Sequence, residues 1–172
     1  MSIKIYTDGS SKGNPGPGGY GIVLLSDKGH RKEVSKGYRI TTNNRMELLS
    51  VIVALEMLKS IPSDVVVYSD SKYVVDAIEK KWVFKWEVKG FNKKKNVDLW
   101  KRFLCVYKKH NVTFIWIKGH ANNAENVLCD KLAVSAAEAK EHHDVDKGYE
   151  SQSQNPRSVS YTHLRAHETD RY

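Results

Sequence analysis

Cysteine, proline and long apolar runs are scarce in this chain of 172 residues. Its two cysteines, Cys105 and Cys129, lie in apolar helical contexts without metal-ligand spacing, which argues against a disulfide scaffold and favours a reduced intracellular protein. No stretch of about eighteen apolar residues occurs, and the first residues lack the apolar core of a signal peptide. We therefore expect a cytoplasmic protein that does not enter a membrane.

Positive charge, by contrast, is in excess. The 28 lysines and arginines outnumber the 20 acidic residues, which gives a net charge of +8 and a pI near 9.4. The excess is concentrated in residues 80–95, KKWVFKWEVKGFNKKK, where seven lysines accompany one glutamate and four aromatic residues. A basic segment interleaved with aromatics is typical of nucleic-acid binding, and a solvated amphipathic helix with core aromatics is the alternative.

The segment 7–23, TDGSSKGNPGPGGYGIV, contains the pattern G-x-G-x-x-G, formed by Gly16, Gly18 and Gly21. In a dinucleotide-binding loop this pattern follows a strand and opens a helix, but here the residues after Gly21 predict a strand. A calcium loop counted from Asp8 would need a bidentate glutamate where Gly19 stands. The pattern therefore predicts a stiff hairpin connection and not a nucleotide or calcium site.

Hydrophobic periodicity predicts an α/β domain with a mixed five-stranded sheet flanked by helices, three antiparallel strands being followed by two parallel ones. The expected strands are residues 2–7, 21–26, 31–40, 65–68 and 112–118. The expected helices are one that ends before Pro62 and the segments 71–81, 97–110 and 125–142. One domain is expected over residues 1–149, and the segment 150–172, which has no apolar period, is expected to be a disordered tail.

Four acidic residues fall where predicted strands end or predicted helices begin. Asp8 follows the first strand, Asp70 follows the buried strand VVVYS, Glu47 lies in the first turn of the long helix, and Asp130 lies early in the last helix. Ligands gather at the ends of adjacent strands in an α/β sheet. Crowded carboxylates repel one another unless a cation neutralises them, and Mg²⁺ or Mn²⁺ prefers such oxygen ligands. The four acids together predict a centre for metal-assisted phosphoryl transfer.

Each acid also has a structural explanation when it is taken singly. Glu47 follows Asn44 by three residues, as in a capping box. Asp70 can cap the next helix, Asp8 can form an Asx-turn, and Asp130 can be a solvated helix residue. The combination of all four with a basic segment favours a metal-dependent nuclease over these separate explanations.

Five segments resemble, in order, the motifs of type I ribonuclease H: TDGSSKGNPGPGGYG, TTNNRMELLSVIVAL, YSDSKYV, NVDLWKR and WIKGHANNAENVLCDKLA. The resemblance covers about residues 3–149. It implies endonucleolytic cleavage of the RNA strand of an RNA–DNA hybrid, with 5′-phosphate and 3′-hydroxyl ends. It implies two Mg²⁺ ions, for which Mn²⁺ is a possible substitute, bound by Asp8, Glu47, Asp70 and Asp130. It also implies that His120, otherwise a solvated loop residue, assists proton movement or product release.

The same resemblance implies contacts with the substrate. The glycine loop would contact 2′-hydroxyls of the RNA, the start of the long helix would contact the DNA, and the basic segment would bind DNA sugars and phosphates. The implied contact residues are Gly9, Ser10, Gly13, Asn14, Thr42, Asn43, Asn44, Lys72, Trp82, Lys85, Trp86 and Lys89. We expect at least one of the two tryptophans to be structural, and Lys72 stands where the family commonly has glutamine.

Two other functions stay open on the sequence. A non-catalytic hybrid-binding module would use the basic segment and the glycine loop without the four carboxylates. A junction resolvase or a 3′–5′ exonuclease with the same kind of sheet would share the acids but not the glycine loop. As a ribonuclease H, the protein is expected to be a monomer whose partner is an RNA–DNA hybrid.

Overall fold

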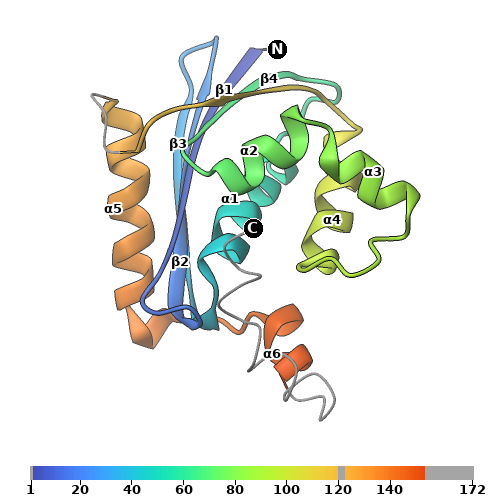
Figure 1. Ribbon diagram of the computed structural model, residues 1–172. Helices are drawn as coiled ribbons and strands as arrows, with labels where there is room; N and C mark the ends of the chain where they lie inside the picture. Colours follow the sequence, from blue (N-terminus) through green and yellow to red (C-terminus); the bar gives the residue numbers. More distant parts are fainter. Residues whose placement is uncertain (1, 120–122, 154–172) are drawn as a thin grey trace.

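The computed structural model describes residues 2–119 and 123–153. These residues form a mixed five-stranded sheet in the order β3-β2-β1-β4-β5, with helices on both faces (Figure 1). The strands are β1 (Ser2–Ser11), β2 (Gly16–Ser26), β3 (Arg31–Thr41), β4 (Asp64–Ser69) and β5 (Asn111–Trp116). The helices are α1 (Asn43–Glu56), α2 (Lys72–Glu79), α3 (Trp82–Val88), α4 (Val97–Tyr107), α5 (Ala124–Glu138) and α6 (Lys147–Ser153), with a 3₁₀ turn η1 at Lys140–His142.

The pairing of the strands confirms the predicted fold. β1, β2 and β3 pair antiparallel, while β1–β4 and β4–β5 pair parallel. The last predicted helix is shorter than expected, because α5 ends at Glu138 and a 3₁₀ turn follows it. No helix of the described residues is long and apolar enough to cross a bilayer.

Helix α1 lies between the sheet and α4, and α5 covers the opposite face (Figure 1). The α1 sequence LLSVIVAL is apolar on almost every side, which is the pattern of a helix that is surrounded by the rest of the protein. Met46, Leu48, Val51, Ile52 and Leu55 are accordingly all inaccessible to solvent. α1 is thus a rigid central element from which a polar side chain near its N-terminus can be held in place.

The glycine pattern belongs mainly to a strand, so the predicted extent of the hairpin connection was wrong. β2 already begins at Gly16, and the connection to β1 covers only residues 12–15. Glycine is required inside the strands because α5 approaches the sheet closely. A Cβ on Gly21 would overlap the carbonyl oxygen of Cys129, and a Cβ on Gly37 would overlap the carbonyl oxygen of Ala136. These glycines therefore let a helix lie directly on the sheet.

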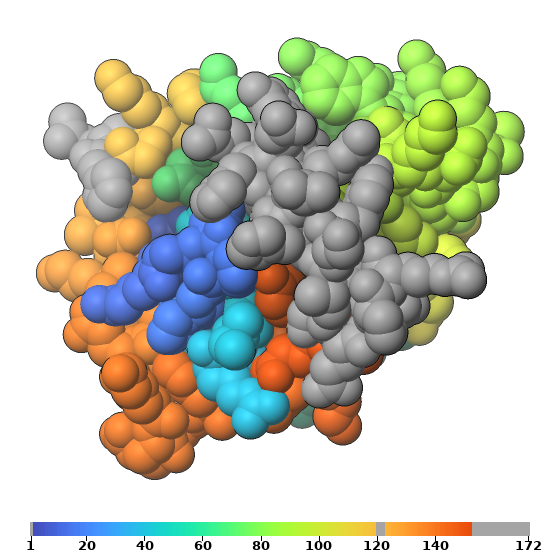
Figure 2. Space-filling view, turned by 60° about the horizontal axis from the view of Figure 1, so that its bottom comes forward, coloured from blue at the N-terminus to red at the C-terminus, as the bar shows by residue number. Residues whose placement is uncertain are grey.

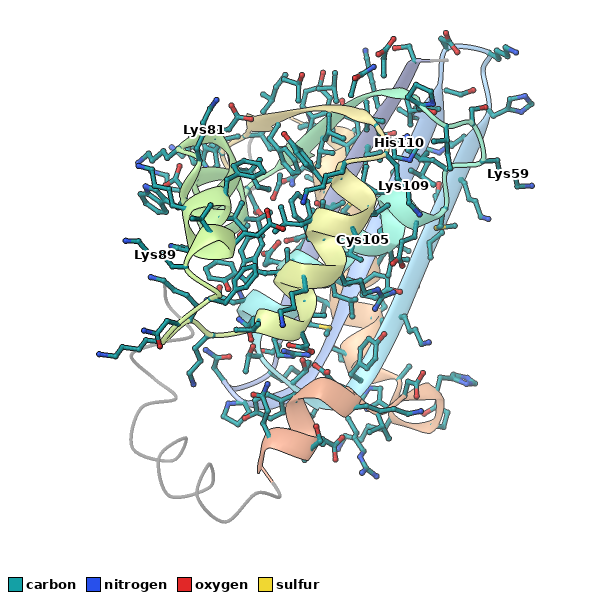
Figure 3. All side chains as sticks on the ribbon, turned by 90° about the vertical axis from the view of Figure 1, so that its right-hand side faces the viewer. Lys59, Lys81, Lys89, Cys105, Lys109 and His110 are labelled. Atoms are coloured by element: carbon teal, nitrogen blue, oxygen red, sulfur yellow. The ribbon has the colours of Figure 1, made fainter. Side chains whose placement is uncertain are left out.

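The two cysteines are free thiols in different surroundings. Cys129 is a buried residue of α5, whereas Cys105 is exposed on α4 (Figure 3). The apolar context predicted for Cys105 holds for its sequence neighbours only, since its own side chain lies on the solvent side of an amphipathic helix.

The chain returns to the sheet after α5 and continues as helix past the predicted end of the domain. The Asp144 backbone pairs with that of Tyr38 on β3, and Glu150 forms a two-pronged ion pair with Arg39. Residues 150–153 therefore belong to α6 and not to a disordered tail, because this ion pair and the helical hydrogen bonds hold them. Residues 154–172 lie outside the described part of the chain, and the division at residue 149 stays a prediction.

Replacing Gly21 with alanine should destabilise the fold by about 1–3 kcal/mol, because the added methyl group would push α5 away from β2. Urea unfolding measures the change. Ser35, which is exposed and pairs with Gly21 across the sheet, provides the control, and Ser35→Ala should stay within about 0.5 kcal/mol of wild type. Equal stability of the two variants would contradict the close packing.

Candidate active site

The parallel pairing of β1 with β4 stops at Tyr6 and Tyr68, whose rings stack with centroids 4.6 Å apart. Two residues further along each segment stand Asp8 and Asp70. Because side chains repeat every two residues along a strand, these aspartates occupy equivalent positions past the last pair. Asp8 is not at a strand end as predicted, since β1 continues against β2 to Ser11. What places Asp8 beside Asp70 is the point at which the pairing of β1 with β4 stops.

Glu47 approaches the two aspartates from α1. Thr42 caps this helix, its hydroxyl oxygen accepting a hydrogen bond from the Arg45 N–H, so Glu47 is the fifth helical residue and lies beyond the predicted first turn. The capping-box explanation is therefore wrong, because Asn44 lies inside the helix. Gly9 allows the close approach of α1 to β1, since a Cβ at this position would overlap the backbone nitrogen of Glu47.

One oxygen from each of Asp8, Glu47 and Asp70 lies within 4.8 Å of the others. Asp8 and Glu47 are only 5% and 6% exposed. Asp8 Oδ1 accepts a hydrogen bond from the Gly9 N–H at 2.9 Å. Glu47 Oε2, in contrast, is buried without a hydrogen-bond partner among the described residues. A buried carboxylate oxygen that lacks a donor is unfavourable, and a cation would satisfy it, so the site fits a divalent metal ion.

Asp130, the fourth predicted ligand, comes from α5 on the opposite face of the sheet. It is half-buried, and its carboxyl group is near enough to Asp8 to contribute to the raised pKa of that residue. It does not belong to the 4.8 Å group formed by the other three acids. His120, the predicted proton carrier, lies outside the described residues.

Burial and mutual repulsion make the cluster hard to ionise. Desolvation, strengthened by the nearby Asp70 and Asp130, raises the pKa of Asp8 to about 8. Burial raises the pKa of Glu47 well above its ordinary value, and the negative charges of Asp8 and Asp70 raise it further. A divalent cation would reverse both shifts, because it favours the charged forms.

The glycine loop is fastened to the start of α1 by a hydrogen bond from the Asn43 N–H to Asn14 Oδ1, 3.0 Å long. Figure 2 shows the blue residues of this loop beside the cyan start of α1 on one face of the molecule. Of the contacts predicted here, Gly13 and Asn43 are exposed, Ser10 and Asn14 are half-buried, and Gly9, Thr42 and Asn44 are buried. The Asn44 Nδ2 is buried and has no hydrogen-bond partner within the described chain.

The basic segment, residues 80–95, forms α3 and its flanking turns and projects beyond the sheet (Figure 1). Lys81 and Lys89, at the two ends of α3, lie away from Cys105 of α4 (Figure 3). Lys85 and Lys89 are both exposed. The segment therefore presents a series of positive charges at one end of the molecule.

The two tryptophans of this segment have different environments. Trp86 is half-buried and packs edge-on against Trp100 of α4, with ring centroids 5.7 Å apart. Trp82 is 42% exposed, and the Lys80 ammonium lies 5.2 Å from its ring centroid. Trp86 thus anchors α3 to the core, as expected for at least one of the pair, and Trp82 remains at the surface.

Arg45, which belongs to none of the predicted site residues, is 1% exposed in the first turn of α1. Its guanidinium donates to Asp98 of α4 at 2.7 Å and to Asp146 before α6 at 2.8 Å. Because Arg45 precedes Glu47 by two residues, these bonds hold α1 in place close to Glu47. The sequence signal for this role was a single arginine in a helix that is otherwise mostly apolar. A cation buried in such a helix needs acidic partners.

A mixed sheet of this strand order, with carboxylates where the β1–β4 pairing stops, defines the class of ribonuclease H-like folds. Residues 1–138 match the family model described as RNase H. The chain is 59% identical over 140 residues to the ribonuclease H of Desulforamulus reducens, with 78% of this chain and 87% of the relative covered. The chain therefore belongs to the ribonuclease H family of enzymes, as a type I member.

Solved structures agree with this assignment. LC9-RNase H1, a type 1 RNase H with the type 2 active-site motif, superposes with a TM-score of 0.71 at 32% identity, covering 92% of this chain and 83% of that one. LC11-RNase H1, crystallised in complex with an RNA/DNA hybrid, superposes with a TM-score of 0.61 at 29% identity, covering 81% of this chain and 99% of that one.

Asp8→Asn should stabilise the metal-free protein at pH 8 by on the order of 1–3 kcal/mol. The folded pKa of Asp8 is raised to about 8, so between about pH 4 and 8 the folded protein keeps a proton that the unfolded chain has lost. Stability in EDTA should therefore fall as the pH rises through this window, and less steeply in the variant. Thermal unfolding at several pH values measures this, with the exposed Glu141→Gln as control. Identical pH profiles for Asp8→Asn and wild type would contradict the raised pKa.

Proposed function

We propose that this protein is an endonuclease that hydrolyses the RNA strand of RNA–DNA hybrids. The observation that carries the proposal is the close group of Asp8, Glu47 and Asp70, with a buried Glu47 oxygen that lacks a partner in the described chain, in a member of the ribonuclease H family. The hybrid bound to LC11-RNase H1 supports the substrate class.

Asp8, Glu47, Asp70 and Asp130 would together hold two Mg²⁺ ions, with Mn²⁺ as a possible substitute. Two such ions supply stabilisation of the attacking and leaving oxygens in an in-line displacement at phosphorus. The chain itself presents its carboxylates from separate elements, so their spacing is set by packing before any ligand binds. A water oxygen would form the new bond to phosphorus as the bond to the ribose 3′ oxygen breaks, which leaves a 5′-phosphate on one product and a 3′-hydroxyl on the other. His120, outside the described residues, would carry a proton or assist product release.

Substrate selection would depend on the glycine loop and the start of α1. We propose that Gly9, Ser10, Gly13 and Asn14 lie against the RNA strand near the cleaved bond, where the 2′-hydroxyls distinguish RNA from DNA. Thr42, Asn43 and Asn44 would contact the DNA strand. The Asn14–Asn43 hydrogen bond supports a shared role, since it holds the two segments side by side.

The basic segment would hold the DNA strand away from the site of cleavage. Lys85 and Lys89, both exposed, would bind phosphates, and the exposed ring of Trp82 would pack on a DNA sugar. Trp86 would contribute indirectly, since its half-buried ring packs on Trp100 and orients α3. Lys72 would contact a phosphate of the RNA strand. A monomeric state and a cytoplasmic location stay predictions from the sequence.

Asp8→Asn and Glu47→Gln should each lower hybrid cleavage by at least about 100-fold, because each removes a ligand charge from the centre. An end-labelled hybrid in Mg²⁺ is compared with single-stranded RNA, duplex RNA and duplex DNA, and Glu141→Gln is the control. Internal RNA cuts confined to the hybrid and lost in EDTA are the expected result. Tight hybrid binding without cleavage would instead indicate a binding module.

The double variant Lys85→Ala/Lys89→Ala should raise KM for the hybrid several-fold with little change in kcat. Each lost phosphate contact should also reduce the slope of log affinity against log salt by up to about 0.9. Titrations of hybrid binding at several salt concentrations in EDTA measure the slope. Lys59→Ala is the matched control, because Lys59 is exposed on the opposite side from Lys81 and Lys89 (Figure 3). An unchanged salt slope would remove the basic segment from the interface.

A further inference from the structure

Trp116 ends the edge strand β5, where it pairs with Ser69 of β4 and stays 44% exposed. Its indole N–H donates a hydrogen bond to the main-chain carbonyl oxygen of Asp70, with an Nε1–O distance of 3.1 Å. Asp70 lies just past the last residue of β4, so this bond holds it where its strand has ended. An aromatic side chain outside the core is thus bonded to the residue that carries a proposed metal ligand.

The chain after β5 encloses Asp70 further. The Ile117 N–H donates to the Ser69 carbonyl at 2.9 Å, which extends the backbone bonding between the two segments one residue past β5. A Cβ on Gly119 would lie 2.8 Å from Asp70 Oδ2, so the chain passes directly against the carboxylate at this point. The end of β5 therefore restrains both the main chain and the side chain of Asp70.

The face of the same indole ring holds a cation. Lys72 is the first residue of α2, and its ammonium nitrogen lies 4.9 Å from the centroid of the Trp116 ring. An ammonium above an aromatic face is attracted by the ring quadrupole, which limits where this flexible side chain points. One ring therefore contacts both a ligand of the carboxylate cluster and the cation two residues after it.

We propose that Trp116 is a positioning residue of the active site, whose N–H sets the place of Asp70 and whose ring face holds Lys72 for a phosphate of the RNA strand. The second half of this assignment rests on the proposed function, and the first half does not. The two contacts use different parts of the indole, so substitutions can separate them. Phenylalanine keeps a ring face and loses the N–H, whereas leucine loses both.

The test compares Trp116→Phe, Trp116→Leu and Lys72→Gln with wild type. Ile115→Ala is the matched control, because Ile115 is the neighbouring residue of β5 and is 41% exposed. Mg²⁺ binding is measured by calorimetry without substrate, kcat and KM are measured on a hybrid, and the thermal midpoint reports stability.

Trp116→Phe should weaken Mg²⁺ binding about 3- to 10-fold, as expected for one lost hydrogen bond, and lower kcat at low Mg²⁺ while KM stays near wild type. Lys72→Gln should raise KM about 3- to 10-fold without changing Mg²⁺ binding. Trp116→Leu should show both effects, and adding Lys72→Gln to it should raise KM no further. Ile115→Ala should change none of these quantities.

The proposal is overturned if both tryptophan variants bind Mg²⁺ like the wild type, keep its KM and differ only in a lower thermal midpoint. Trp116 would then be a structural residue. If the wild-type protein binds Mg²⁺ but does not cleave hybrids, the proposed function fails, and weaker Mg²⁺ binding in Trp116→Phe would still support the role toward Asp70. Absence of Mg²⁺ binding in the wild-type protein would overturn both.

Discussion

Repulsion among buried carboxylates is the constraint around which this molecule is built. Asp8, Glu47 and Asp70 bring oxygens within 4.8 Å of one another, and Asp130 lies beside them. Such a group is unfavourable without a cation, so the rest of the fold must supply the energy that holds it together. The acids are carried by β1, by α1, by the segment just after β4 and by α5. A common core joins α1 to the strands, and α5 packs against β1, β2 and β3 on the opposite face. No single element could bring them this close.

Close approach of helices to the sheet makes this arrangement possible. Gly9 lets α1 contact β1 on one face, and Gly21 and Gly37 let α5 contact β2 and β3 on the other. Arg45 then fastens the N-terminal turn of α1 to the segment before α6 through a buried ion pair with Asp146, and to α4 through a partly buried one with Asp98. A buried arginine with two acidic partners adds little net stability but disfavours other packings of α1. The position of Glu47 depends on this combination of small residues and one fixed cation.

Negative and positive charge are separated in the molecule. The acidic centre lies where the β1–β4 pairing stops, and the basic segment, residues 80–95, forms α3 and its flanking turns beyond the sheet (Figure 1). Aromatic rings join each charged region to the protein. Trp86 packs on Trp100 below the basic segment, and Trp116 bonds to Asp70 and holds Lys72. Trp116 combines the surface of an aromatic ring with a directed hydrogen bond, which suits a boundary between core and solvent.

The sequence by itself determined the order of strands and helices, the mixed sheet and the four acids, because hydrophobic period and motif spacing are local properties of the chain. The tertiary structure alone decided which acids meet. It showed that Thr42, not Asn44, caps α1, and that Gly19 and Gly21 lie in β2 and allow the close packing of α5. It also decided that Trp86 is an anchor while Trp82 stays at the surface, and that Arg45 and Trp116 support the site. These facts depend on contacts between residues far apart in the chain, and no local pattern of residue types encodes such contacts.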